Sequence, residues 1–447
     1  MEQRDVATKH DGAKTLGGHV IFRKILFLKQ PQRFALVCVA SLTAGLLPQF
    51  AAARVVTWRE ALDMAETSHP RLRAAIAEAD AGRAAVRTAR AIPNPQLAAA
   101  GGHQAVRVAG NVGGTAYSVA ATQPLDFGPV RSTRVSLAEA EQRRAELNVE
   151  LVRLEVLSAA RRAFFEALRQ RDELALLQDN VRLVQDLLRK VALRVEVGEG
   201  ARLEAIRAEA EVALAVTAAN KAELERARTL AELKNAIGLL PTVPLEIDGA
   251  PDPPRPLFPL DQLRAEVTAK HPALLLSRAE VASAQARLSY ESALRLPQAS
   301  FLTQVDYPPD TPVYLFGFEL PVPLWNLRQG PIAEAQAQLR RAQELARIRE
   351  LELLARLEAS YQRYQIAAQQ VRAIESALLR EAEQALEATE AAYRLGERGL
   401  LDVLDAQRVL RQVRLSLVQA QYERQAALID LDELRAVDPR HEPDLKQ

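Results

Sequence analysis

The sequence predicts a mainly α-helical chain with a smaller β part, built from two similar halves that each hold a β-hairpin and a pair of long helices. Two runs, 131–237 and 332–438, contain no proline and only one pair of glycines each. Alanine, leucine, glutamate and arginine fill most of both runs, so helix is favoured throughout and only the glycines favour a break. Each run is therefore expected to form two helices that meet at its glycine pair.

The two halves carry the same short motifs in the same order. Lys270-His-Pro-Ala-Leu274 repeats Ser68-His-Pro-Arg-Leu72, and Leu296-Pro-Gln298 repeats Asn94-Pro-Gln96. Both pairs lie 202 positions apart (271 − 69 and 297 − 95), so no gap intervenes. We therefore expect a duplicated structure.

The N-terminal residues 1–53 are expected to be an extension followed by a secretory signal. Basic residues between Arg23 and Arg33 precede an apolar segment, Phe34–Leu47, and three alanines end at Ala53. This order of basic, apolar and small residues is typical of a signal peptide. The apolar segment is shorter than the roughly 20 residues that a membrane-spanning helix needs. Cleavage near Ala53 is the main interpretation, and retention as an anchor is the alternative.

The first structural repeat is expected to cover 54–240. A helix is predicted over 57–91, where apolar residues recur at helical spacing until two prolines end it. Glycine, valine, threonine and alanine then predict a β-hairpin over 96–127, with its turn at Gly110–Gly114.

A long helix is predicted over 131–197 and a return helix over 201–237. At 1.5 Å per residue the long helix measures roughly 100 Å, and the return helix little more than half of that. The return helix and the 57–91 helix, stacked end to end, would match the long one.

A proline-rich linker, 241–259, precedes the second repeat at 260–438, and a tail at 439–447 follows it. The second repeat is predicted to contain a helix, a hairpin over 298–324, and helices over 332–395 and 402–435. The return strand of its hairpin alternates, with Tyr314, Phe316, Phe318 and Leu320 on one side, as in a strand with one apolar face.

Four strands per chain cannot close a barrel with a lumen, because the smallest membrane barrels have about eight. Left open, such a sheet exposes edges that pair with other copies. The last helix carries a 3-4 apolar repeat from Val403 to Leu434, interrupted only by Arg424, which is typical of a coiled-coil seam. Oligomerisation would join the strands into one barrel and the helices into one tube.

Composition argues against several other classes of protein. The formal net charge of +1 offers no basic face for nucleic acid. A single cysteine, Cys38, excludes a disulfide framework and a cysteine-rich zinc site. His69 and His271 each precede a proline, which favours a helix-start role over metal ligation, and His103 stands alone. No nucleophile–base pairing, phosphate loop or metal spacing is visible, so we expect no enzyme activity, no metal site and no cofactor.

The glycine-containing stretches are the best candidates for a functional site. Gly198–Glu209 aligns without gaps on Gly396–Gln407. Asp402 and Asp405 lie three residues apart on the first turn of the last helix, so both carboxylates share one face at the end where the helix dipole favours negative charge. The alternative reading is ordinary helix N-terminal charge.

These two stretches, with the Pro-Asn-Pro-Gln opening at 93–96, resemble the TolC-like outer-membrane efflux channels, most closely the heavy-metal efflux branch. The resemblance covers Val55 to about Val437. It implies a homotrimer whose 12-stranded β-barrel crosses the outer membrane. It also implies a periplasmic α-helical coiled-coil barrel about 100 Å long, where a periplasmic adaptor protein and an inner-membrane pump, of the RND type, dock.

The resemblance also assigns residues one at a time. Asp402 and Asp405 match acidic positions that ring the periplasmic entrance. Tyr393 and Arg398 match positions that hold the closed state, and Glu204 stands where the acidic partner of the tyrosine, a shorter aspartate, is found. Two helix-hairpin tips match surfaces that meet the adaptor: Val197, Gly198, Glu199, Leu395, Gly396 and Glu397.

The function expected from this resemblance is a passive exit duct in an efflux system for metal cations or small toxic compounds. A periplasmic coiled-coil adaptor or scaffold without a pore is the alternative from another class. A duct for type I protein secretion is a further alternative within the same class.

Overall fold

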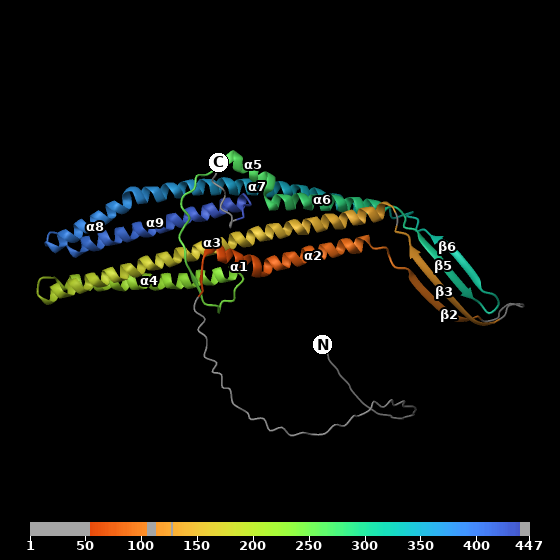
Figure 1. The fold of residues 1–447 in the computed structure, drawn as a ribbon, viewed down its shortest axis with the longest axis horizontal. Helices are drawn as coiled ribbons and strands as arrows, with labels where there is room; N and C mark the ends of the chain where they lie inside the picture. Colours follow the sequence, from red (N-terminus) through yellow and green to blue (C-terminus); the bar gives the residue numbers. More distant parts are fainter. Residues whose placement is uncertain (1–53, 105–112, 127, 439–447) are drawn as a thin grey trace, which may run out of the picture. The chain divides into compact units, whose positions relative to one another are not determined.

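The computed structural model describes residues 54–104, 113–126 and 128–438, which all lie within one compact unit. Figure 1 shows two pairs of long helices running side by side, with a β-sheet at one end and the helix-hairpin tips at the other. The signal segment, the first hairpin turn up to residue 112 and the C-terminal tail, all predicted above, lie outside the described residues.

The first repeat runs from a short strand to a long helical hairpin. Its elements are β1 (Arg54–Val56), α1 (Trp58–Ser68), α2 (Pro70–Arg90), β2 (Gln96–Gln104), β3 (Gly114–Pro124), α3 (Pro129–Glu196) and α4 (Arg202–Ala236). The second repeat has the same order. Its first strand, β4 (Leu245–Ile247), lies in the linker, and the elements that follow are α5 (Leu260–Lys270), α6 (Pro272–Ala293), β5 (Ser300–Tyr307), β6 (Val313–Glu319), α7 (Gln329–Ala373), a π-helical turn (Ile374–Leu378), α8 (Leu379–Arg394) and α9 (Leu400–Leu434).

The single helix predicted over 57–91 is wrong, because the chain breaks at His69 into α1 and α2. A residue before proline is disfavoured in helical conformation, and His69 is extended, with φ −67° and ψ 124°. Its Nδ1 accepts a hydrogen bond from the backbone N–H of Arg71, at 3.2 Å, and so caps α2. His271 caps α6 in the same way, accepting from Ala273 at 3.1 Å. The predicted helix-start role of both histidines is confirmed.

The continuous helix predicted over 332–395 is also wrong in one place. A π-helical turn, Ile374–Leu378, separates α7 from α8. The turn contains no glycine or proline, so composition gave no signal for it.

The 68-residue helix α3 is covered along its length by two shorter stretches that meet end to end. It packs against α4 over one part and against α1 and α2 over the other. At the junction, Ser68 Oγ donates to the carbonyl of Ile237 at 3.1 Å. The central core beside this junction contains Phe164 and Leu168, both with no exposed surface.

The four long strands form one antiparallel sheet in the order β2-β3-β5-β6. The two hairpins join through β3 and β5, where Val119 pairs with Val305. The second hairpin, predicted over 298–324, is confirmed, since β5 ends at Tyr307 and its partner β6 starts at Val313. None of the described helices is long and apolar enough to span a membrane.

The proline-rich linker crosses the middle of the helices and ties the repeats together. Its strand β4 pairs in parallel with β1, a small sheet that the sequence did not predict. Asp252 accepts hydrogen bonds from the buried guanidinium of Arg161 on α3, at 3.0 Å, and from the side chain of Gln425 on α9, at 2.9 Å. Arg161 also donates to Asp432 at 2.8 Å. A buried arginine between two carboxylates thus fixes the linker to both repeats.

The buried cap His271 predicts an acid-sensitive step in stability. Burial lowers the pKa of His271. The negative charge of Glu433 raises this pKa, and the positive charges of Arg356 and Arg349 lower it further. The unfolded chain therefore binds a proton below about pH 6.5 that the folded chain resists, so stability is lost as the pH falls through this range. His271→Asn keeps a capping side chain that does not titrate. We expect thermal melts between pH 7.5 and pH 5.5 to lose fewer degrees in this variant than in the wild type. The same loss in both proteins would contradict this, and His103→Asn, exposed on β2, is the control.

Candidate functional site

The tips of the two helical hairpins are built by one turn used twice. Gly198 and Gly396 have left-handed backbones, with φ of +81° and +79°, which favours glycine. Glu199 N–H donates to Arg194 at 2.8 Å, and Glu397 N–H donates to Ala392 at 3.0 Å, so both turns close the preceding helix by the same hydrogen bond. All six predicted tip residues, from Val197 to Glu199 and from Leu395 to Glu397, are exposed.

The two acidic residues at the start of α9 lie on its open side. Asp402 Oδ2 accepts a hydrogen bond from the N–H of Gly399 at 3.1 Å, so this carboxylate also caps the helix. Arg398 lies 3.8 Å from Asp402, and Arg408 lies 3.4 Å from Asp405. Because these side chains are largely exposed, the ion pairs contribute little to stability, and both carboxylates stay available to solutes.

Tyr393, the last aromatic residue of α8, is buried between the two hairpins. It belongs to an apolar cluster with Val191 of α3, Ala208 of α4 and Leu400 of α9. The guanidinium of Arg194 lies 5.0 Å from the centre of the tyrosine ring, a cation–π contact.

The Tyr393 hydroxyl is buried and makes no hydrogen bond of good geometry with the described residues, although Arg194 lies beside its ring. Burial, and then the negative charge of Glu204, raises the pKa of this hydroxyl. Glu204 thus lies close enough to act on Tyr393 by its charge, without a direct hydrogen bond within the described chain. The sequence did not single out Arg194.

A second contact between the hairpins is polar and lies further along α9, at Arg408 and Arg411. Glu211 of α4 is buried and accepts a hydrogen bond from Arg408 of α9 at 2.5 Å, with Arg411 at 3.5 Å. The hydrogen bond from Arg408 lowers the pKa of Glu211, against the effect of burial. A sequence signal existed, since Glu211 falls between the buried alanines 208 and 215 on the packed face of α4, where a charge needs a partner.

The open space beside Glu211 lies between the hairpins rather than in an enclosed active site. A groove of about 760 Å³ runs between α3, α4 and α9, with Glu211 and Arg408 among its lining residues. Across the described part of the chain, no three histidine, cysteine or acidic side chains gather closely enough to hold a metal ion. The exposed carboxylates of Asp402 and Asp405 can attract cations. The buried contacts of Tyr393 and Glu211 hold the two helical hairpins together.

The contact between Glu211 and Arg408 predicts that substituting one partner destabilises the fold more than substituting the other. Arg408→Ala leaves a buried carboxylate with only the longer Arg411 contact, whereas Glu211→Gln leaves two partly exposed guanidinium groups that water can solvate. We expect Arg408→Ala to cost about 2–3 kcal/mol and Glu211→Gln about 1 kcal/mol. Thermal unfolding of both variants measures the difference, with the exposed Arg394→Ala as the control. A larger loss for Glu211→Gln would contradict this order.

Comparison with known proteins relates most of the chain to outer-membrane efflux proteins. A family model described as outer membrane efflux protein matches residues 61–239 and 263–436. The cobalt-zinc-cadmium resistance protein CzcC of Cupriavidus metallidurans is 26% identical over 378 residues, covering 81% of this chain and 86% of CzcC.

Two crystal structures share the fold at low sequence identity. The CmeC outer membrane channel of Campylobacter jejuni matches with a TM-score of 0.76 and 13% identity, covering 85% of each chain. The outer membrane protein VceC of Vibrio cholerae matches with a TM-score of 0.73 and 17% identity, covering 85% of this chain and 96% of VceC. The predicted fold class, duplicated β-hairpin and long-helix repeats, is confirmed. The chain belongs to the outer membrane efflux protein family, as the resemblance of its glycine-containing stretches predicted.

Proposed function

We propose that three copies of this chain form a passive exit duct that carries metal cations from a periplasmic adaptor and an inner-membrane pump to the cell exterior. The observation that carries this proposal is the four-stranded sheet, which is open at both edges and has one exposed, aromatic face. Its composition and pairing fit a segment of a membrane barrel better than part of a soluble scaffold.

The two faces of the sheet differ in chemistry. The register places Val119, Val305 and Tyr314 across one face, which continues into Phe316 and Phe318, each 74% exposed. The opposite face is more polar, and its polar members are Gln96, Gln104, Ser118, Thr122, Ser300, Gln304, Asp306 and Glu319. An apolar side for lipid and a polar side for a water-filled lumen is the pattern of a transmembrane barrel.

The number of strands supports three copies. β2 and β6 are the edges of the sheet, and neither pairs with another described strand along its outer side. Three copies would supply 12 strands and leave no free edge. The helices carry apolar side chains with no cover in one chain, such as Leu224 and Leu351, each 69% exposed, and neighbouring copies would cover them in a tube.

Asp402 and Asp405 support a cation-selective entrance. In a trimer they would place six carboxylates around the axis, where converging negative charge raises the local concentration of cations. The name of CzcC, a cobalt-zinc-cadmium resistance protein, supports metal ions as the cargo. The exposed tips at Gly198 and Gly396 would meet the adaptor, and an RND-type pump would supply the energy.

The duct is tested first by recording single-channel currents from the mature protein in planar bilayers. A trimer-sized particle with small, cation-preferring conductances is the expected result. A particle that never conducts, even in the variant with a weakened lock described below, would favour the periplasmic scaffold instead.

Asp402→Asn/Asp405→Asn should reduce the preference for cations over anions by roughly twofold or more. One charge about 8 Å from an ion in water contributes about 0.5 kcal/mol, which by itself is about a twofold change. Six charges are removed per trimer, so twofold is the lower limit of the expected change. Reversal potentials under a salt gradient measure this preference, and block by divalent cations should weaken in parallel. Glu387→Gln, on the exposed surface of α8, is the matched control. Unchanged selectivity in the double variant would remove the acidic ring from the proposal.

Tyr393→Phe/Arg398→Ser should raise the resting conductance. We propose that Tyr393, Arg398 and Glu204 hold the closed tip in the trimer, where the Tyr393 hydroxyl, unpaired within one described chain, would bond to a neighbouring copy. Losing that hydrogen bond and one exposed ion pair removes about 1–2 kcal/mol. That loss shifts a closed–open equilibrium by about five- to thirtyfold. Arg394→Ser, an exposed arginine one turn away, is the control. A resting conductance equal to that of the wild type would rule out the lock.

A further inference from the structure

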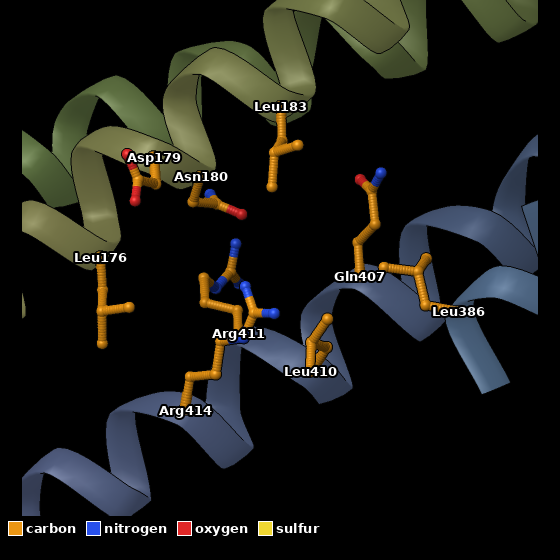
Figure 2. Close-up of a pocket in the computed structure, with 9 residues that line it drawn as sticks. All are labelled: Leu176, Asp179, Asn180, Leu183, Leu386, Gln407, Leu410, Arg411 and Arg414. Atoms are coloured by element: carbon orange, nitrogen blue, oxygen red, sulfur yellow. The ribbon is translucent and has the colours of Figure 1, made fainter. Parts of the chain in front are cut away.

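We propose that a small cavity between α3 and α9 is a water-binding site that joins the two helical hairpins through Asn180 and Gln407. The cavity measures about 40 Å³ and is lined by side chains of α3 and α9 and by Leu386 of α8, with Asn180 and Gln407 among them. Figure 2 shows Asn180 reaching from α3 into the space between the helices and Gln407 reaching up from α9.

Two amide groups in this cavity lack the hydrogen bonds that burial requires. Asn180 is 7% exposed, and its Nδ2 has no partner among the described residues. Gln407 Oε1 is likewise buried and unpaired in the described chain. A buried amide without a hydrogen-bond partner destabilises the folded chain, so two such groups facing one cavity call for a shared ligand.

The charges around the cavity are already paired, which selects a neutral ligand. Arg414 forms an ion pair with Glu383 at 2.8 Å, Arg411 lies 3.5 Å from Glu211, and Asp179 pairs with Arg182. What remains is one donor and one acceptor on two neutral side chains. Water can accept from one amide and donate to the other, and it can do so for either orientation of each amide group.

The size and the lining of the cavity agree with water. A water molecule needs about 10–15 Å³ of such volume, so about 40 Å³ holds about three or four molecules. The four leucines among the lining residues, such as Leu183 and Leu410, form its apolar part. Water bound here would complete a polar layer next to the Glu211–Arg408 contact.

The location gives this water a mechanical role. Gln407 lies two residues after Asp405 and ends the stretch that most resembles the efflux family. Apolar contacts join the hairpins on both sides of the cavity, at Tyr393 and at Leu177. The two hairpins can separate at this water-filled layer without leaving either amide unpaired, because bulk water replaces the bound molecules.

A cryo-EM structure of the full trimer in lipid nanodiscs tests the site directly. We expect density for ordered water within about 2.7–3.2 Å of both amides in every protomer. A direct bond between Asn180 and Gln407, or a cavity without water density, would overturn the proposal. Neither outcome depends on conduction, so the test is separate from that of the proposed duct.

A double-variant cycle gives the independent measurement. Asn180→Leu and Gln407→Leu, made singly, each leave the other amide unpaired and should lower Tm by about 2–6 °C. The double variant removes both amides and fills the cavity, so its Tm should exceed that of either single variant. Gln178→Leu, an exposed amide on α3, is the matched control and should change Tm little. Additive losses in the double variant would overturn the shared water.

Discussion

The structure depends on covering the apolar face of α3, a helix that no single partner in its own repeat matches in length. The chain meets this requirement with α4 and the α1–α2 pair, placed end to end. Their junction is tight, because a Cβ added to Gly238 would lie 3.2 Å from the Cα of His69. Gly238 also has a left-handed backbone, with φ of +73°, so glycine is favoured there on two grounds. The His69–Pro70 break belongs to the same requirement, since it redirects the chain at the point where α4 ends.

The second repeat keeps this geometry with different residues. Ala436 ends α9 with φ of +53° and donates to Glu433 at 2.9 Å, as Gly238 ends α4 and donates to Asn235 at 3.1 Å. An alanine in the left-handed region costs about 1–2 kcal/mol, so the packing of α9 against α5 and α7 holds a conformation that its sequence disfavours. The two repeats thus share a backbone path, although the second has alanine where the first has the glycine that favours it.

Most of the fold could be predicted because it follows from long uniform patterns. Proline-free runs define α3, α4 and α9, and alternation defines β6, without any contact between distant residues. The prediction errors fall at elements whose structure depends on contacts between distant residues or on local adjustments of the backbone. β1 and β4 are three residues each and pair across almost the whole first repeat, and the π-helical turn has no compositional mark. At the tips, the acids and glycines were visible in sequence. Arg194 beside Tyr393 was not, because its partner lies on another helix and in the other repeat.

The first turns of α9 show how packing between the repeats orients the acidic pair that we propose for the entrance. Val403 and Leu410 are buried against the other helices, Arg408 reaches Glu211 on α4, and Asp405 is left exposed. A rotation of α9 about its axis would move all four together, since they share about two helical turns. The contacts of Glu211 and Tyr393 with the opposite repeat therefore set the direction in which the acidic pair points. If Asp402 and Asp405 line the entrance as proposed, a change at these buried contacts is expected to alter ion selectivity without removing either carboxylate.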